Sequence, residues 1–231
     1  MTPPQAKPIS VLLVDDHAVV REGYRRLLER ADGIEVVGEA ASAAEAYHAF
    51  CRCLPDVVVM DISLPDVSGI EAMRRLLQRE PAARILVFSI HDEAIFPDRA
   101  YRAGARGYVT KASAPDVLVD AVRAVARGDV FLSPDVAQTI ALRAMSDGDD
   151  ALRALSDREF EIVRLLVHGR SVRQIAAMLC LNYKTVANYQ SLIKQKLKAD
   201  TAVDIVRIAE QSGLLASDRD RPSPRISTTP S

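Results

Sequence analysis

Residues 9 to 109 alternate between short runs rich in β-branched residues and longer segments with helical periodicity, which limits the folds open to this chain. Several of the runs are apolar nearly throughout, which favours strands covered on both faces of a parallel sheet. The expected strands span residues 9–14, 34–39, 56–61, 84–89 and 107–109, and the expected helices span residues 18–31, 42–52, 69–80, 95–103 and 114–127. Because parallel strands need right-handed crossovers, we predict an α/β fold with a doubly wound sheet of five parallel strands.

Three residues are expected to mark helix ends in this region: the N-caps Ser42 and Ser113, and the helix stop Gly128. Pro97 should delay the fourth helix, because proline lacks the N–H that a helix interior needs. We therefore expect that helix to begin around Phe96 or Pro97, with Ile95 and Phe96 in a loop.

The pattern changes after residue 128, where the strand signals end. One helical stretch at 134–145 precedes a polar, acidic segment, and further helical segments follow at residues 157–167, 171–179, 183–198 and 201–212. A second, all-α domain of four helices is therefore expected. The predicted divisions are an N-terminal extension at 1–8, the α/β domain at 9–128, a helix and linker at 129–150, the helical domain at 151–215 and a disordered tail at 216–231.

The composition is typical of a globular protein, with 48% hydrophobic and 26% charged residues among 231. No apolar run approaches the roughly 18 residues that a membrane helix needs. The N-terminus lacks the apolar core of a secretory signal. We therefore expect a cytoplasmic protein with no membrane partner, in which Cys51, Cys53 and Cys180 are reduced, structural thiols.

Carboxylates follow two of the expected strands. Asp15 and Asp16 come after the first strand, and Asp61 comes after the third. The carboxyl ends of parallel strands share one edge of the sheet, where ligands bind. Clustered carboxylates repel, so they must share protons, meet cations or hold a metal, and their hard oxygen ligands suit Mg²⁺. Ser89 and Lys111 lie at two further strand ends and add a hydroxyl and a cation.

This set of residues permits phosphoryl transfer to a carboxylate, with a metal and a lysine neutralising charge on the phosphate oxygens. Asp61 is the expected nucleophile because it stands alone at a central strand end, whereas Asp15 and Asp16 are paired and suit metal coordination. A single aspartate at a strand end usually caps the next helix, but five suitable residues at four strand ends favour a functional site. His17 and His91 flank the site and, as loop histidines, are expected to be solvated rather than catalytic.

The first domain resembles the receiver domains of response regulators in four segments, VLLVDDH, VVVMDISLPDVSGIE, ILVFSIHDE and GARGYVTKASAPDVL. A flavodoxin-like strand arrangement is expected for it. The resemblance implies that Asp61 is the phosphoacceptor and that a sensor histidine kinase is the donor. It also implies a Mg²⁺ site formed by Asp16, Asp61 and the backbone carbonyl of Ser63, with Asp15 acting largely through water. The other implied roles are those of the switch hydroxyl Ser89, the switch aromatic Tyr108 and the phosphate-binding Lys111.

Residues 169 to 199 hold six lysines and arginines and no acidic residue. Such a stretch is either a solvated helical face or a surface for a polyanion. Short breaks separate the helical segments here, as in a helix-turn-helix, and each segment begins with a capping signal. The expected capping residues are Ser156 with Glu159, Ser171 with Gln174, and Asn182.

The third helix of this domain carries one apolar face, so the opposite face can meet water or DNA. Lys184 and the helix N-terminus would bind phosphates, and Asn188 and Gln190 would read base edges. The residues expected to face DNA are Lys184, Thr185, Ala187, Asn188, Tyr189, Ser191 and Lys194.

The second domain resembles the LuxR-type DNA-binding domain of NarL/FixJ-family regulators in the elements L-S-x-R-E, G-x-S, I-A-x-x-L, K-T-V and K-L. Ala187 and Ser191 stand where commoner members carry lysines, so the operator should differ. The segments TVANY, FPDRA and GLL are most similar to the GacA/UvrY branch. The resemblance implies a transcription factor that acts with RNA polymerase, and a receiver that masks the recognition helix until it is phosphorylated. The last helix presents more apolar surface than a single small domain readily covers, and so predicts a homodimer when active. Its apolar residues are Val203, Ile205, Val206, Ile208 and Ala209.

Three alternatives compete with this interpretation. A haloacid-dehalogenase-like phosphatase requires a second aspartate two residues after its nucleophile. Residue 63 is serine, so this general acid is missing. A LuxR-type sensor of a small molecule would not need the acidic set with Ser89 and Lys111. A receiver that keeps the fold without using phosphate stays open. We therefore expect a response regulator that is not an enzyme.

Overall fold

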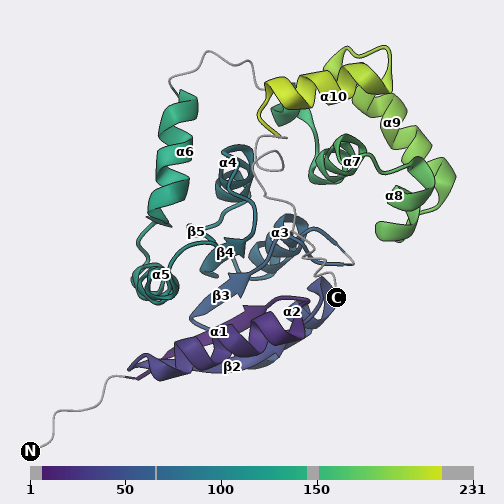
Figure 1. The fold of residues 1–231 in the computed structure, drawn as a ribbon. Coiled ribbons are helices and arrows are strands. Elements are labelled where there is room, and N and C mark those ends of the chain that lie inside the picture. Colours follow the sequence, from purple (N-terminus) through teal and green to yellow (C-terminus); the bar gives the residue numbers. More distant parts are fainter. Residues whose placement is uncertain (1–6, 66, 145–150, 215–231) are drawn as a thin grey trace, which may run out of the picture.

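The computed structural model describes residues 7–65, 67–144 and 151–214. Within these ranges one sheet contains six parallel strands in the order β2-β1-β3-β4-β5-β6. Figure 1 shows this sheet with the helical domain beside it. The strands are β1 (Ile9–Val14), β2 (Ile34–Ala40), β3 (Val57–Met60), β4 (Ile85–Ser89), β5 (Gly107–Thr110) and β6 (Phe131–Leu132). The parallel α/β class is confirmed, but the expectation of five strands was wrong. The two residues of β6 are too short a run for periodicity to reveal, and they form a strand because they pair with Gly107 and Tyr108 of β5.

Helices cover both faces of the sheet. They are α1 (Ala18–Arg30), α2 (Ala43–Cys53), α3 (Gly69–Arg79), α4 (Ile95–Arg102) and α5 (Pro115–Arg127). Alternate residues of a strand point to opposite faces, so Val11 and Leu13 pack in the core formed with α1 and α5. Leu12 and Val14 pack in the other core with α2, α3 and α4. Burial on both faces explains why the strands are apolar throughout.

The expected helix ends are confirmed at two of three positions. The backbone N–H of Glu45 donates to the Ser42 hydroxyl at the start of α2, and Gly128 ends α5 in the left-handed conformation. The prediction that Ser113 caps α5 was wrong. Ala114 occupies the cap position without a side-chain bond, because the Ser113 hydroxyl donates to Asp135 instead.

Helix α4 begins earlier than expected. Ile95 and Phe96 lie inside the helix and are each 1% exposed, so the prediction that they lie in a loop was wrong. Pro97 falls in the first turn, where backbone N–H groups have no partner within the helix, and proline costs little there. Burial of the two apolar side chains therefore sets the start of the helix.

The rest of the described chain is helical. It contains α6 (Pro134–Ala144), the short 3₁₀ helix η1 (Ala151–Ala154), α7 (Asp157–Val167), α8 (Val172–Met178), α9 (Tyr183–Leu197) and α10 (Ala202–Gln211). Both predicted capping boxes are present, at the starts of α7 and α8, and Asn182 caps α9 by accepting from Thr185 N–H at 2.8 Å. The predicted four-helix, helix-turn-helix domain is therefore confirmed.

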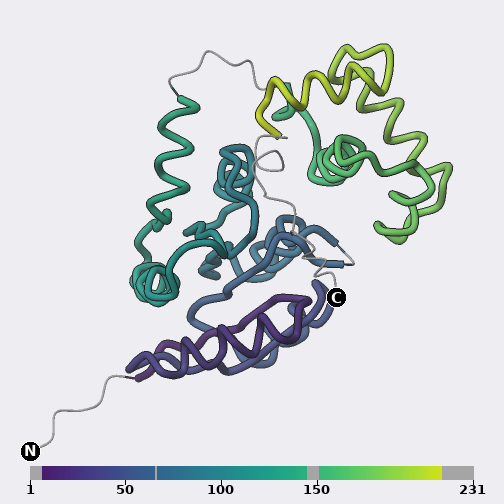
Figure 2. Tube along the Cα trace, in the orientation of Figure 1, coloured from purple at the N-terminus to yellow at the C-terminus, as the bar shows by residue number. Residues whose placement is uncertain are grey.

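The helical domain packs against the α/β domain through α4 and α7. The rings of Phe96 and Phe160 meet edge to face, with 5.4 Å between their centroids. Both side chains belong to one apolar cluster that continues from the sheet into the helical domain. Helix α9 lies on the outer side of that domain, away from the sheet (Figure 2).

Some predictions fall on residues outside the described ranges, namely those for residues 1–6, the segment 145–150 and the tail 216–231. The divisions between domains accordingly stay predictions. All three cysteines are described, and none is in a disulfide, as expected. No described helix combines the length and apolar character needed to cross a bilayer.

Candidate functional site

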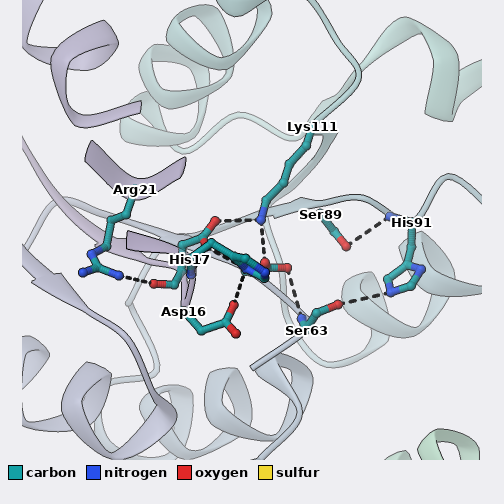
Figure 3. A network of polar contacts seen from close by, with 9 residues as sticks. Asp16, His17, Arg21, Ser63, Ser89, His91 and Lys111 are labelled. Carbon is teal, nitrogen blue, oxygen red and sulfur yellow. Dashed lines mark hydrogen bonds and ion pairs between the residues drawn. The ribbon is translucent and has the colours of Figure 1, made fainter. Parts of the chain in front are cut away.

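Three strand ends bring Asp15, Asp61 and Lys111 together. The Lys111 ammonium donates to Asp15 Oδ2 at 2.6 Å and to Asp61 Oδ2 at 2.5 Å (Figure 3). Asp15 and Asp61 are only 2% and 3% exposed. They follow β1 and β3, which are neighbours in the sheet, and Lys111 follows β5. The parallel topology thus creates the compact acidic site predicted at this edge.

Burial and neighbouring charges shift the pKa values of Asp61 and Lys111 in opposite directions. Burial raises the pKa of the Asp61 carboxyl above its usual value, although Lys111 acts to lower it. Burial alone would lower the pKa of Lys111, but the carboxylates of Asp61 and Asp15 raise it. Lys111 is therefore held as a cation at the bottom of the site. Lys111 pairs with Asp15 and Asp61, whereas the neighbouring Asp16 pairs with His17.

The donor set suits a hard divalent cation. One carboxylate oxygen of Asp15, one of Asp16 and a ring nitrogen of His17 all lie within 4.8 Å of one another. Asp16 Oδ1 is buried, and His17 Nδ1 lies 2.8 Å from it. Two neighbouring carboxylates offer the hard oxygen ligands that fit Mg²⁺. Asp61 is not in this group, and Lys111 separates it from Asp15.

The loop after β3 is held tightly around Asp61. The backbone N–H of Ser63 donates to Asp61 Oδ1 at 3.0 Å. A β-carbon at Gly69 would lie 2.0 Å from the Asp61 carbonyl oxygen, so only glycine lets α3 begin this close to the site. The sequence analysis missed Gly69, and its only signal was a glycine after Ser68 ahead of a helical pattern.

Ser89 and Tyr108 both meet His91. The Ser89 hydroxyl accepts from the His91 backbone N–H at 3.2 Å, and the Tyr108 hydroxyl donates to the His91 carbonyl at 2.7 Å. Tyr108 is 1% exposed, and this burial raises its pKa well above the usual value. The His91 side chain is 13% exposed, so the expectation of a solvated histidine was wrong there. It was right for His17, whose side chain is 67% exposed.

A second hydrogen-bond network flanks Lys111 and was missed by the sequence analysis. The Thr110 and Ser113 hydroxyls both donate to the Asp135 carboxylate in the first turn of α6. Burial would raise the pKa of Asp135, but these hydroxyls lower it. The three residues carry no recognisable local pattern, because α6 meets this loop only in the folded chain. Together they tie the Lys111 loop to α6.

Helix α9 carries the residues predicted to face DNA. Lys184, Asn188 and Ser191 are exposed, whereas Thr185, Ala187, Tyr189 and Lys194 are partly buried. Tyr189 also packs against the core of the helical domain. The Lys194 ammonium donates to the carbonyl of Asp200. The exposed members Lys184, Asn188 and Ser191 are spaced four and three residues apart and therefore share one face of α9.

Comparisons with known proteins agree for both halves of the chain. The response regulator receiver domain matches residues 11–123, and the luxR family of bacterial regulatory proteins matches residues 153–209. Response regulator GacA of Pseudomonas aeruginosa is 36% identical over 209 residues, which cover 90% of this chain and 98% of GacA. The chain belongs to the LuxR-type response regulators.

Two further similarities support this family assignment. Response regulator UvrY of Escherichia coli K12 is 37% identical over 89% of this response regulator and 95% of UvrY. A LuxR-family two-component response regulator from Aurantimonas sp. SI85-9A1 is 50% identical over 61% of this chain and all of that chain, with a TM-score of 0.59. The resemblance to GacA and UvrY noted in the sequence is thereby confirmed. Response regulators of this kind are transcription factors rather than enzymes.

The structure of this response regulator contradicts one expectation. The receiver was expected to mask the recognition helix, but Lys184, Asn188 and Ser191 of α9 are exposed. The receiver contacts η1 and α7 instead, because Arg99 of α4 donates to the carbonyl of Leu152 in η1 and to the Asp157 carboxylate in α7.

Proposed function

We propose that this response regulator is switched by phosphorylation of Asp61 and controls transcription by binding DNA through α9. The observation that carries the proposal is the Lys111 ammonium held between the buried carboxylates of Asp15 and Asp61. A phosphoryl group on Asp61 brings negative charge next to this ammonium, which is already in place to pair with it.

The reaction is phosphoryl transfer to a carboxylate. An Asp61 oxygen forms a bond to the phosphorus of a phosphohistidine on a sensor kinase, and the bond from phosphorus to the imidazole nitrogen breaks. The Ser63 N–H and Lys111 hold the Asp61 carboxylate in one orientation. Asp15, Asp16, Asp61 and the Ser63 carbonyl would hold Mg²⁺, which neutralises charge on the phosphoryl oxygens when it is bound. Ser89 and Tyr108 are the residues that respond to the new group.

DNA binding is assigned to α9. Its N-terminus, capped by Asn182, and Lys184 would contact phosphates, and Asn188 would read a base edge. Thr185, Ala187, Tyr189, Ser191 and Lys194 complete the proposed DNA-facing set. Ile205 and Ala209 of α10 are buried within the helical domain, so the expectation that they form a free apolar surface was wrong. Val203 is 75% exposed and offers an apolar contact for a second copy, so we propose a dimer on DNA. RNA polymerase is the proposed partner at the promoter, and the cytoplasm is the proposed location.

The test uses the full-length protein with acetyl phosphate and Mg²⁺. We expect one acid-labile phosphoryl group per chain by intact mass, formed only when Mg²⁺ is present. Bound duplexes are then selected from a random-sequence DNA pool, and the enriched sequence is measured by gel shift with and without phosphorylation. Absence of the phosphoprotein would leave a receiver fold that does not use phosphate. A phosphoprotein that enriches no sequence would contradict the assignment of α9.

A further inference from the structure

His91 lies at the centre of a set of contacts that the proposed chemistry does not require. Its ring Nε2 lies 3.2 Å from the hydroxyl of Ser63, two residues after Asp61. Its backbone N–H donates to the Ser89 hydroxyl (Figure 3). Its carbonyl accepts from the Tyr108 hydroxyl. His91 therefore contacts the phosphoacceptor loop and both switch residues at once.

The other side of the His91 ring faces the helical domain. The ring stacks on Phe96 with 4.1 Å between centroids and 8° between planes. Phe96 in turn meets Phe160 of α7 edge to face. The Arg99 guanidinium lies over the Phe160 ring, 4.5 Å from its centroid, and also binds Asp157. One continuous line of ring contacts thus runs from the receiver pocket into the DNA-binding domain.

We propose that His91 transmits the state of the phosphorylation pocket to the DNA-binding domain by positioning Phe96 against Phe160. This inference rests on the proposed phosphorylation of Asp61. His91 is a positioning residue, because it acts through Ser89, Tyr108 and Phe96 rather than on the phosphoryl group.

The direction of the effect follows from the hydrogen bonds. A phosphoryl group on Asp61 attracts the Ser89 hydroxyl, and the 3.2 Å bond from the His91 N–H to that hydroxyl is lost as Ser89 moves. Phe96 and Phe160 are 1% and 3% exposed, so their rings lie in close-packed surroundings. A displacement of His91 therefore displaces these rings as well. Phosphorylation therefore loosens the contact between α4 and α7.

Two substitutions separate the ring stack from the polar contact. His91→Phe keeps an aromatic ring on Phe96 but loses the bond to Ser63. His91→Gln keeps a polar group near Ser63 but loses the stack. Both leave the backbone contacts of residue 91 to Ser89 and Tyr108 in place, so each variant removes one feature only.

The measurement is amide hydrogen exchange of residues 151–160 in the full-length protein, with and without acetyl phosphate and Mg²⁺. In the wild type, phosphorylation should speed exchange there roughly two- to tenfold, the range expected for losing an aromatic contact. His91→Gln should show the faster exchange without phosphate and respond little to phosphate. His91→Phe should behave like the wild type. Exchange in α1, far from the contact, is the internal control.

Phosphorylation is scored in the same samples by intact mass, which separates this inference from the proposed function. Unchanged exchange at 151–160 in a phosphorylated wild type would overturn the transmission through His91. So would a normal response in His91→Gln combined with its loss in His91→Phe, because the bond to Ser63 would then be the link. If the wild type accepts no phosphate, the proposed function fails. Independently of that result, slow amide exchange in unphosphorylated His91→Gln would overturn the proposed role of the His91–Phe96 stack.

Discussion

The receiver pocket and helix α9 of this response regulator differ in how deeply their functional side chains are buried. In the receiver pocket Asp15 and Asp61 are 2% and 3% exposed, and Lys111 joins residues that are 96 and 50 positions away in the chain. On α9 the residues proposed to meet DNA lie within a few turns of one helix, and Lys184 and Asn188 are exposed. The pocket is thus assembled by the fold, whereas the DNA-facing surface is built by the periodicity of one helix.

This difference in burial predicts how substitutions in each region affect the protein. A buried charge has lost its water, so removing its partner leaves the remaining charge without compensation. An exposed side chain keeps its water and stabilises the fold little, so its loss is felt only when DNA is bound. Substitutions in the pocket should therefore change both chemistry and stability, and substitutions on α9 should change recognition alone.

The largest expected effect is the loss of phosphorylation in Asp61→Asn. An amide cannot attack phosphorus as a carboxylate does, so labelling by acetyl phosphate with Mg²⁺ should fall to background. Asp116→Asn makes the same chemical change at an exposed position of α5 and should label normally. Full labelling of the Asp61→Asn variant would show that another carboxylate accepts the phosphoryl group.

Lys111→Met tests whether the pocket depends on its internal cation. The change leaves Asp15 and Asp61 without their shared partner, which should lower the free energy of unfolding by about 3–5 kcal/mol in the absence of Mg²⁺. Added Mg²⁺ should restore part of that loss, because it binds only the folded site. Urea unfolding with and without Mg²⁺ measures both effects.

The matched control for this change is Lys184→Met on α9. Lys184 is exposed, so its substitution should alter the free energy of unfolding by no more than about 0.5 kcal/mol. Equal losses of unfolding free energy in the two methionine variants would show that the buried pocket and the exposed helix do not differ in their dependence on a lysine.

Asn188→Ala should affect specific DNA binding alone. If Asn188 reads a base edge, the change should cost about 1–3 kcal/mol on the selected sequence and nothing on random duplexes. Lys184→Ala should instead weaken all sequences alike and reduce the salt slope of binding by roughly one unit. Gel shifts on both duplexes at two salt concentrations distinguish these results. Unchanged affinity in both variants would mean that α9 is not the recognition helix.

The smallest expected effect is a difference in acid response between the two regions. Burial would raise the pKa of Glu159 in α7, but bonds from Lys196 and Ser156 lower it. Because the folded-state pKa is lowered, Glu159 stabilises the domain above its unfolded pKa. This contribution is lost as the pH falls through the folded-state pKa. Asp61 has the opposite sign, because burial raises its pKa and penalises its charged form at higher pH.

Acid titration of unfolding checks these signs. The Lys196 side chain is 40% exposed, so the advantage of wild type over Glu159→Gln should stay below about 1 kcal/mol and vanish in acid. The stability of wild type relative to Asp61→Asn should fall as pH rises through the pKa of Asp61. The same slope for both pairs would contradict the assigned causes.

Local signals in the sequence determined most of the architecture. The alternation of apolar runs and helical segments predicted the parallel sheet, and Ser42, Ser156, Ser171 and Asn182 were identified as caps because a cap bonds only three residues along the chain. The acidic site was predictable for a related reason. Parallel topology alone places the residues that follow each strand at one edge, so no side-chain detail was needed to bring Asp15, Asp61 and Lys111 together.

Only the tertiary structure decided the features that depend on contacts between distant segments. The strand β6 exists through pairing with β5, and Ser113 fails as a cap because Asp135 of α6 accepts its hydroxyl. The start of α4 follows from the burial of Phe96 against Phe160, and the same contact, with Arg99 on Asp157, leaves α9 uncovered. These features depend on which distant segments of the chain pack together after folding. Periodicity and local motifs carry no information about that choice.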